Sequence, residues 1–469
     1  MTGIDCKFNP FRLYYSCFRT GILFHKILNK CLSLCQYSRI TTFCMGSGTL
    51  LFLFYFLLFA LLLKWLCRRK ILAVSFTQVF LLFALKVILG SLYGYLFLSL
   101  YGGDDTWVYH AQGIDEYNNL IQNPIRFVTD IFENNYPGSL MNSLFETNNS
   151  YWKSLEYTVL IKLLAIFNIF SRGDYFVNVI LFSFLVMWGN YFLFKVFSKY
   201  FPRLKKILLL LIFFFLPFIF WTSGIRKDGV ILLLLGICLF QFSCITGGKA
   251  SWKNWVITIL AVSLTYIIRN YVALMLIPAL ICWYIGKKYP AHSLKIFISI
   301  YLLFIFIFFA SSQFHPSLNL PEKVARRQHE FIELSGGSYV ESDTLQPTIR
   351  SYVLNFPQAA AHVFFRPYPF ERRSFLFQGS ALETYFCLAM FLISFIFTHK
   401  EAGVSLRHPF ILACLFFSLS NYILIGYTVP FVGAIVRYKS IYEVLLLAVA
   451  LIVTDWQRLK RWLGKEARQ

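Results

Sequence analysis

Acidic residues are scarce in this sequence. The chain of 469 residues has 22 Asp and Glu against 44 Lys and Arg, and charged residues make up only 14% of it. Hydrophobic residues reach 58%, with 53 phenylalanines and a mean hydropathy of +0.61. Because a soluble domain must cover its apolar core with a polar surface, this composition excludes a water-soluble protein.

Several signatures of common enzymes and metal sites are also missing. The sequence has no Walker loop, no dinucleotide-binding glycine pattern, no HExxH and no Gly-x-Ser-x-Gly. Its eleven cysteines form no CxxC and no Cys/His spacing of a metal site. Nothing in the sequence therefore supports P-loop nucleotide hydrolysis, a zinc peptidase or an α/β-hydrolase.

Long apolar runs are present in large number. A helix that crosses a membrane needs roughly 20 apolar residues, and several runs reach that length. The candidate spans cover residues 48–66, 71–101, 175–198, 207–222, 229–246, 254–268, 270–286, 293–311, 376–398, 409–428 and 436–454. We therefore predict an all-α polytopic membrane protein with about 10–12 transmembrane helices.

The net charge of +22 could point to nucleic acid, but the placement of the basic residues argues against that partner. Most of them lie in short segments at the ends of the spans, as the positive-inside rule expects. The five segments are 199–206, 249–253, 287–295, 400–407 and 458–468. We predict a multi-pass protein of the inner (cytoplasmic) membrane, with these segments inside and the lipid bilayer as a partner.

The same rule places two long segments, 102–174 and 312–373, on the outer side. This assignment requires that residues 157–171 do not cross the membrane. That stretch is short and contains Lys162, so we interpret it as an interfacial helix of the first outer segment.

Residues 1–44 form a basic, cysteine-rich extension without a signal-peptide pattern. If they lay inside, the span 48–66 would deliver Lys64 and Arg68 to the outside, against the charge rule. Our hypothesis is that Met45 is the true start and that residues 45–469 form the transmembrane domain. The alternative is a basic interfacial helix on the cytoplasmic face.

An aspartate pair, Asp104-Asp105, follows the second apolar run. The stretch from residue 104 to 156 holds eight of the 22 acidic residues and only two basic ones. Adjacent carboxylates beside aromatic residues such as Tyr109 can supply a general base or orient a divalent cation. The alternatives are a solvated helix start for the pair and, for His110, a structural histidine rather than a ligand.

Three consecutive charged residues, Arg226, Lys227 and Asp228, separate two other spans. Our topology places this turn on the same face as Asp104. Arg and Lys at a helix end can bind a phosphate, and the aspartate could brace them or contact a sugar hydroxyl. An ordinary charged turn is the alternative.

Basic residues at the predicted outer ends of other spans run against the positive-inside rule. Arg269 lies between two spans, Arg366 lies in the second outer segment, and Arg437-Tyr438 opens the last span. Such arginines suggest an anionic ligand, such as the phosphate of a polyprenyl carrier. Snorkelling to lipid headgroups is the alternative for each of them.

The order of these features resembles the GT-C superfamily of integral-membrane glycosyltransferases, most closely over residues 85–245. The similar features are Asp104-Asp105 leading to Tyr109 and Ala111, the turn Ser171 to Asp174, Pro217 followed by Ser223 to Asp228, and the late Arg437-Tyr438. Two features depart from the family pattern. A span precedes the one leading to the aspartates, and Asp-Asp stands where Asp-Glu is frequent.

The resemblance implies transfer of a sugar from a polyprenyl-phosphate-linked donor to a lipid-linked glycan or other acceptor at the outer face. It implies that Asp104 or Asp105 is the base of an inverting displacement, and that basic residues such as Arg226 and Arg437 hold the donor phosphate. It leaves open whether a metal takes part. A polysaccharide polymerase of the O-antigen or capsule type, and a lipid or glycan transporter, are the alternatives.

Overall fold

The computed structural model describes residues 47–133, 150–248, 250–314, 318–334, 336–371 and 374–466. Over these ranges the chain forms nineteen α-helices, three short 3-10 helices and no β-strand. The prediction of an all-α polytopic fold is therefore confirmed. The predicted extension 1–44, and with it the hypothesis about Met45, lies outside the described residues.

The longer helices follow one another with short connections. In chain order they are α3 (Ser47–Arg68), α4 (Phe76–Tyr101), α5 (Asp105–Gln122), α6 (Pro124–Thr129), α7 (Tyr151–Ser171), α8 (Tyr175–Tyr200), α9 (Lys205–Phe214), α10 (Leu216–Trp221), α11 (Lys227–Ile245), α12 (Trp252–Ile268), α13 (Asn270–Lys288), α14 (Ser293–Phe314), α15 (Leu320–Ile332), α16 (Ile349–Phe365), α17 (Phe375–Ile396), α18 (Ala402–Leu406), α19 (Pro409–Thr428), α20 (Val432–Val453) and α21 (Trp456–Glu466).

Nine helices of the described chain are long and apolar enough to cross a membrane, fewer than the eleven spans predicted. They are α3, α4, α7, α8, α11, α13, α14, α17 and α19. The predicted span 207–222 is instead two helices, because Phe215 is extended and Pro217 has no N–H to continue the α9 ladder. Two further predicted spans are not among the nine. The span 254–268 corresponds to α12, which has 17 residues, and the span 436–454 corresponds to α20, which contains Arg437, Lys439 and Glu443.

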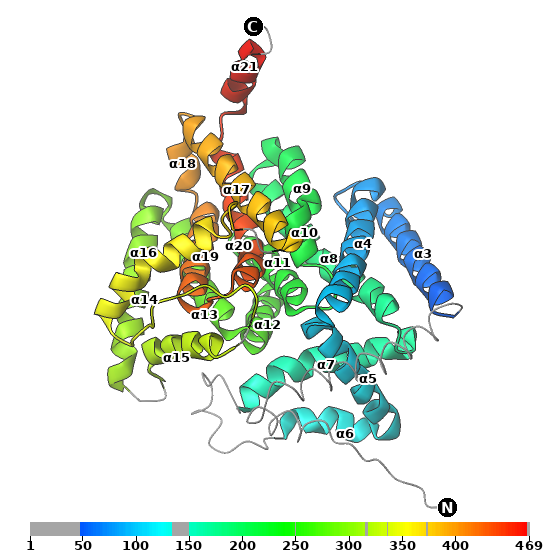
Figure 1. Cartoon of the computed structure of the whole chain (residues 1–469). Helices are drawn as coiled ribbons and strands as arrows, with labels where there is room; N and C mark the ends of the chain where they lie inside the picture. The colour runs from blue at the N-terminus through cyan, green and yellow to red at the C-terminus, as the bar shows by residue number, and fades with distance from the viewer. Residues whose placement is uncertain are drawn as a thin grey trace, which may run out of the picture.

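Several helices of the outer segments lie crosswise to the others. In Figure 1 α6, α7 and α15 run across the lower ends of the upright helices and α5 descends from α4 toward α6, whereas α18 and α21 lie at the opposite end. We predicted an interfacial helix over residues 157–171. The corresponding helix is α7, which begins earlier, at Tyr151. Its length and composition would allow it to span, but its crosswise direction is that of an interfacial helix.

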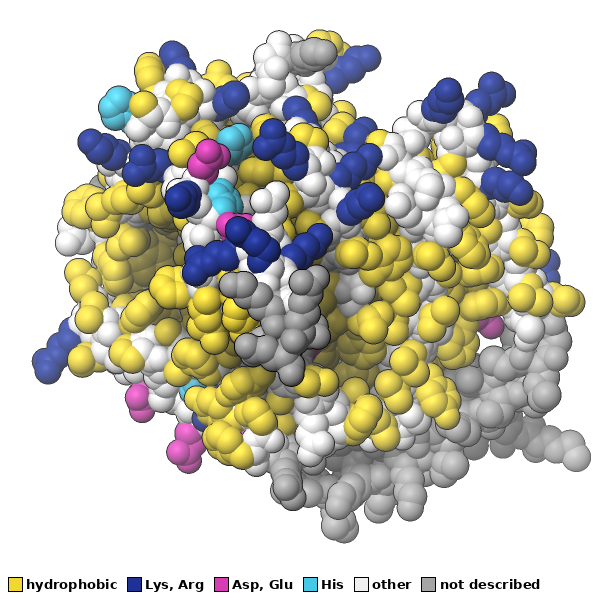
Figure 2. Space-filling view, turned by 90° about the horizontal axis from the view of Figure 1, so that it is seen from above, with side chains coloured by type: hydrophobic (Ala, Val, Ile, Leu, Met, Phe, Trp, Pro, Cys, Tyr) yellow, Lys and Arg dark blue, Asp and Glu magenta, His cyan; other side chains and the backbone are white. Residues whose placement is uncertain are grey.

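The basic segments meet at the end that carries α21. The Lys199 ammonium donates to the Ser243 carbonyl at 2.6 Å, and Lys205 donates to the Ala73 carbonyl at 3.4 Å. The rings of Tyr200 and His408 lie 5.0 Å apart. Figure 2, which views this end, shows many more Lys and Arg side chains than Asp and Glu. A single basic face is what the positive-inside rule requires.

Glycines allow α4, α8 and α11 to approach one another closely. A Cβ on Gly236 would lie 2.5 Å from the carbonyl oxygen of Gly189, so α8 and α11 touch through their backbones. A Cβ on Gly90 would lie 2.7 Å from the amide nitrogen of Gly224, whose φ of +74° favours glycine. These contacts fix the turn that precedes α11, where the charged residues of the candidate site begin.

Candidate functional site

Asp104 starts α5 and is occupied by local contacts. Gly102, with a φ of 73°, ends α4, and the Asp104 carboxylate caps α5 by accepting from the Thr106 amide at 3.2 Å. The Tyr93 hydroxyl donates to the same carboxylate at 2.5 Å. Burial raises the pKa of Asp104, an effect that the Tyr93 hydrogen bond and the nearby Arg226 oppose. Asp104 thus connects α4 to α5.

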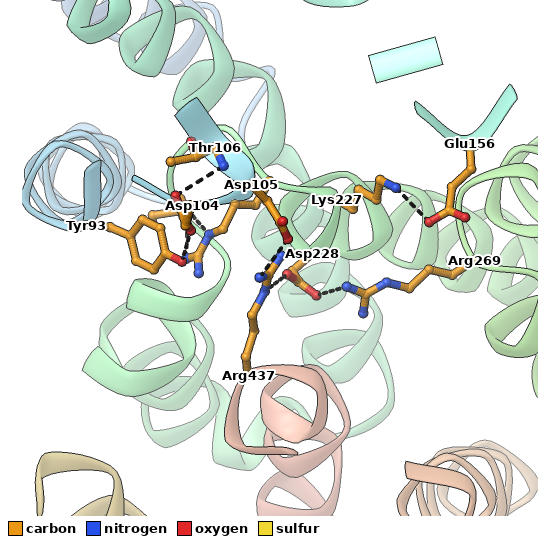
Figure 3. A network of polar contacts seen from close by, with 11 residues as sticks. Tyr93, Asp104, Asp105, Thr106, Glu156, Lys227, Asp228, Arg269 and Arg437 are labelled. Carbon is orange, nitrogen blue, oxygen red and sulfur yellow. Dashed lines mark hydrogen bonds and ion pairs between the residues drawn. The ribbon is translucent and has the colours of Figure 1, made fainter. Parts of the chain in front are cut away.

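Asp105 points to a different partner. Its side chain is 60% exposed, and its Oδ2 lies 3.4 Å from Nη1 of Arg437, which comes from α20. Figure 3 shows the two aspartates turned apart, Asp104 toward Tyr93 and Asp105 toward Arg437. Of the pair, only Asp105 lines the large cavity described below.

Asp228 is held between two arginines. Its Oδ2 accepts from Nε of Arg437 at 2.7 Å, and its Oδ1 lies 2.7 Å from Nη2 of Arg269. The Asp228 side chain is 1% exposed. Burial would lower the pKa of Arg269, but the Asp228 carboxylate raises it well above its ordinary value. The Arg269 guanidinium also lies 4.5 Å from the ring centre of Tyr438. Asp228 with Arg269 and Arg437 forms an arginine clamp, which fixes both guanidinium groups at the cavity wall (Figure 3).

A second set of charges joins α7 to α11. Lys227 donates to Glu156 at 2.7 Å, and Lys153 pairs with the other oxygen of Glu156, also at 2.7 Å. The Lys227 ammonium lies 3.5 Å from the ring centre of Tyr157. Lys227 was predicted as a site residue. Glu156 was counted in the acidic stretch without a role, because its sequence neighbours do not show that it meets α11.

Arg226 supports the turn before α11 and does not line the cavity. It is fully buried, its Nη2 donates to the Ser223 carbonyl at 2.9 Å, and its guanidinium stacks 3.7 Å from the ring centre of Tyr93. The ammonium of Lys86 binds the carbonyl of Thr222 in the same turn, at 3.1 Å. The geometry therefore gives Arg226 a structural position, in contrast to the donor-phosphate role that we expected from the resemblance.

Two further candidates also lie outside the cavity lining. Arg366 pairs with Glu371 at 3.0 Å, within its own loop, and the structure does not bring it to the cavity with Arg269 and Arg437. His110 is buried edge-on against Tyr175, and its Nδ1 lies 3.5 Å from the Asn178 amide. Burial lowers the pKa of His110 to about 4. A neutral, packed histidine fits the structural interpretation rather than a ligand.

The remaining candidates apart from Asp228, which is buried against the two arginines, line one cavity with about 1680 Å³ of empty space when its open mouth is counted. Part of its lining is charged and aromatic and includes Asp105, Tyr109, Lys153, Glu156, Tyr157, Lys227, Arg269, Arg437 and Tyr438. Another part is apolar and includes Leu274, Met275, Phe304, Phe308, Leu424, Ile425 and Val429 from α13, α14 and α19. Helix α15 adds Lys323 and Arg327, which sequence reasoning missed.

In the part of the chain that the structure describes, no group of three or more His, Cys, Asp or Glu could hold a metal ion. Comparison of the chain with protein-family models, curated proteins and solved structures finds no match.

Proposed function

We propose that the protein transfers a sugar from a polyprenyl-phosphate-linked donor to a lipid-linked glycan or other acceptor at the outer face of the membrane. One observation carries the proposal. A single cavity is lined by a carboxylate, Asp105, by fixed cations, Arg269 and Arg437, and by apolar side chains from three long helices. Such a cavity suits a ligand with an anionic head and a hydrocarbon tail.

Each part of the reaction has a matching group. Asp105 accepts the proton of the acceptor hydroxyl as its oxygen attacks the anomeric carbon of the donor. The new carbon–oxygen bond forms as the bond from that carbon to the phosphate oxygen breaks, with inversion. The lipid phosphate leaves with an added negative charge, which Arg269 and Arg437 stabilise. Asp228 keeps both guanidinium groups in place.

The order of sequence features that resembles GT-C enzymes supports the same proposal. A polysaccharide polymerase would use the same kind of donor and the same groups, and differs in its acceptor. Both are glycosyl transfers, and the acceptor that is consumed distinguishes them.

A transporter is favoured by one other observation, because buried charges inside membrane helices often mark transport paths. Lys439 and Glu443 of α20 and Glu383 of α17 are all buried. The Lys439 ammonium lies 3.8 Å from Glu443 and donates to the Thr384 hydroxyl at 3.1 Å. This cluster does not line the cavity. An enzyme therefore explains the cavity better than a transporter does.

The test removes the charge of Asp105. Asp105→Asn keeps the size of the side chain, and it should lower the transfer rate by about 100- to 10,000-fold, the contribution of a general base. Glycan assembly is measured in cells or with membranes supplied with the donor lipid, alongside the amount of protein in the membrane. Asp104→Asn should have a smaller effect, because Asp104 does not line the cavity.

The matched control is Asp115→Asn, an exposed aspartate on the same helix. It should leave assembly and membrane level unchanged. Full assembly by the Asp105→Asn variant would remove the main support for a glycosyl-transferring enzyme.

A further inference from the structure

The charges around the cavity do not balance. Six basic side chains line it, namely Lys153, Lys227, Arg269, Lys323, Arg327 and Arg437. Four carboxylates pair with them, namely Asp105, Glu156, Asp228 and Glu330. Among the described residues, two positive charges are left over. A ligand with two negative charges would neutralise them.

Half of the excess lies on α15, where Lys323 and Arg327 meet one carboxylate, Glu330. The other half lies on Lys153 and Lys227, which share Glu156. Leu320, Lys323, Val324, Arg327 and Phe331 line the cavity, at the spacing of one face of a helix. Among the described residues, Lys323 has no carboxylate within ion-pair distance. The Arg327 guanidinium pairs with Glu330 at 3.2 Å and keeps 37% of its side chain exposed. Both cations are thus available to a ligand.

These two cations are separate from the arginine clamp. Arg269 and Arg437 belong to the α12–α13 turn and to α20, and both are already engaged with Asp228. Lys323 and Arg327 approach from another helix of the same cavity. A sugar linked to a lipid through one phosphate carries one negative charge, and a sugar linked through a diphosphate carries two. The charge count and the two sets of cations match the second arrangement.

We propose that the donor is linked to its lipid through a diphosphate, with one phosphate held by Arg269 and Arg437 and the other by Lys323 and Arg327. This inference rests on the proposed function and narrows its substrate class. The leaving group is then the lipid diphosphate, and the bonds that form and break are otherwise the same.

The experiment measures binding without transfer. The purified full chain in lipid nanodiscs is titrated with polyprenyl phosphate and with polyprenyl diphosphate, neither carrying a sugar. The unsubstituted protein should bind the diphosphate about tenfold more tightly or better, as expected for added charge-assisted contacts. The double variant Lys323→Ala/Arg327→Ala should bind both lipids with similar affinity.

Two controls come from the same helix. Arg326→Ala removes a cation that pairs with Glu322 on the exposed face of α15, and it should keep the diphosphate preference. Lys323→Arg/Arg327→Lys retains both charges and should keep most of the preference. A loss of the preference in the Arg326→Ala variant would mean that the effect is not specific to the cavity face.

Equal affinity of the unsubstituted protein for both lipids, or a preference that survives in the double alanine variant, would overturn the diphosphate inference alone. Binding of neither lipid would overturn the proposed function together with it. A diphosphate preference combined with full glycan assembly by Asp105→Asn would retain the binding site and reject the proposed chemistry.

Discussion

At the scale of single residues, the site contains carboxylates with different tasks. Asp228 is buried between Arg269 and Arg437 and cannot leave them without exposing two buried cations to an apolar environment. Asp104 caps a helix and binds Tyr93. Asp105 is largely exposed in the cavity. Because a general base must reach the acceptor, these surroundings select Asp105.

Arg437 is one of the two guanidinium groups that we assign to the donor phosphate, so its removal tests that role, and Asp228 still pairs with Arg269. We expect Arg437→Ala to raise the KM for the donor by about tenfold or more, with a smaller change in kcat, because a contact to the phosphate is lost. Steady-state kinetics with varied donor concentration would measure this. Arg366→Ala, which removes a cation outside the cavity lining, is the control. A donor KM that stays unchanged in Arg437→Ala would contradict the assignment.

His110 predicts a pH dependence of stability. Burial lowers its pKa from 6.5 to about 4, so between these values the unfolded chain binds a proton that the folded chain excludes. Stability is therefore lost as the pH falls from about 6.5 to 4, by up to about 3 kcal/mol from this residue. Melting temperatures in detergent across this range should fall less steeply for His110→Gln. Burial also lowers the pKa of His362 and His408 to about 4, so some slope should remain. An equal slope in both proteins would argue against a neutral His110.

At the scale of elements, apolar run length predicted the helices well where a helix is unbroken. The run 409–428 matches α19, and 175–198 falls two residues short of the end of α8. The break at Phe215 was missed because an apolar run containing one proline has the same composition whether it kinks or separates. Run length also cannot show the direction of a helix, which is what sets α7 apart.

The site was predicted in part, for a similar reason. Lys227, Arg269 and Arg437 stand out because each interrupts an apolar sequence, and the structure brings all three to one cavity. Arg366 also interrupts an apolar sequence, but it pairs with Glu371 in its own loop. The sequence does not single out Arg327, because charged residues are ordinary on an amphipathic helix. Only the packing of α15 shows which of its faces meets the cavity.

The contact between α8 and α11 depends on glycine. Gly236→Ala would place a Cβ 2.5 Å from the Gly189 carbonyl oxygen, so the helices must separate, at a cost of about 1–3 kcal/mol. The expected result is a lower melting temperature of the purified protein. Gly379→Ala on α17 is the control, because a Cβ there meets nothing within 4 Å. Equal melting temperatures for the two variants would show that the helices adjust without strain.

At the scale of the whole molecule, the basic face and the candidate cavity lie at opposite ends. The described parts of the basic segments lie at the end that carries α21 (Figures 1 and 2). Helices α5, α7 and α15, which lie at the opposite end, contribute to the lining of the candidate cavity. The positive-inside rule then predicts that the cavity faces the outer side, where the proposed acceptor would be found. The side of the membrane is thus tied to the function, because a cavity that opened to the cytoplasm could not serve an outer acceptor.

Cysteine labelling with a membrane-impermeant maleimide can test this orientation. Arg326 on α15 and Glu401, which directly precedes α18, are both exposed. Helices α15 and α18 lie at opposite ends of the upright helices (Figure 1). Arg326→Cys should be labelled in intact cells and Glu401→Cys only after permeabilisation, with the unsubstituted chain as background. Labelling of both from one side would reject the topology and with it an outward cavity.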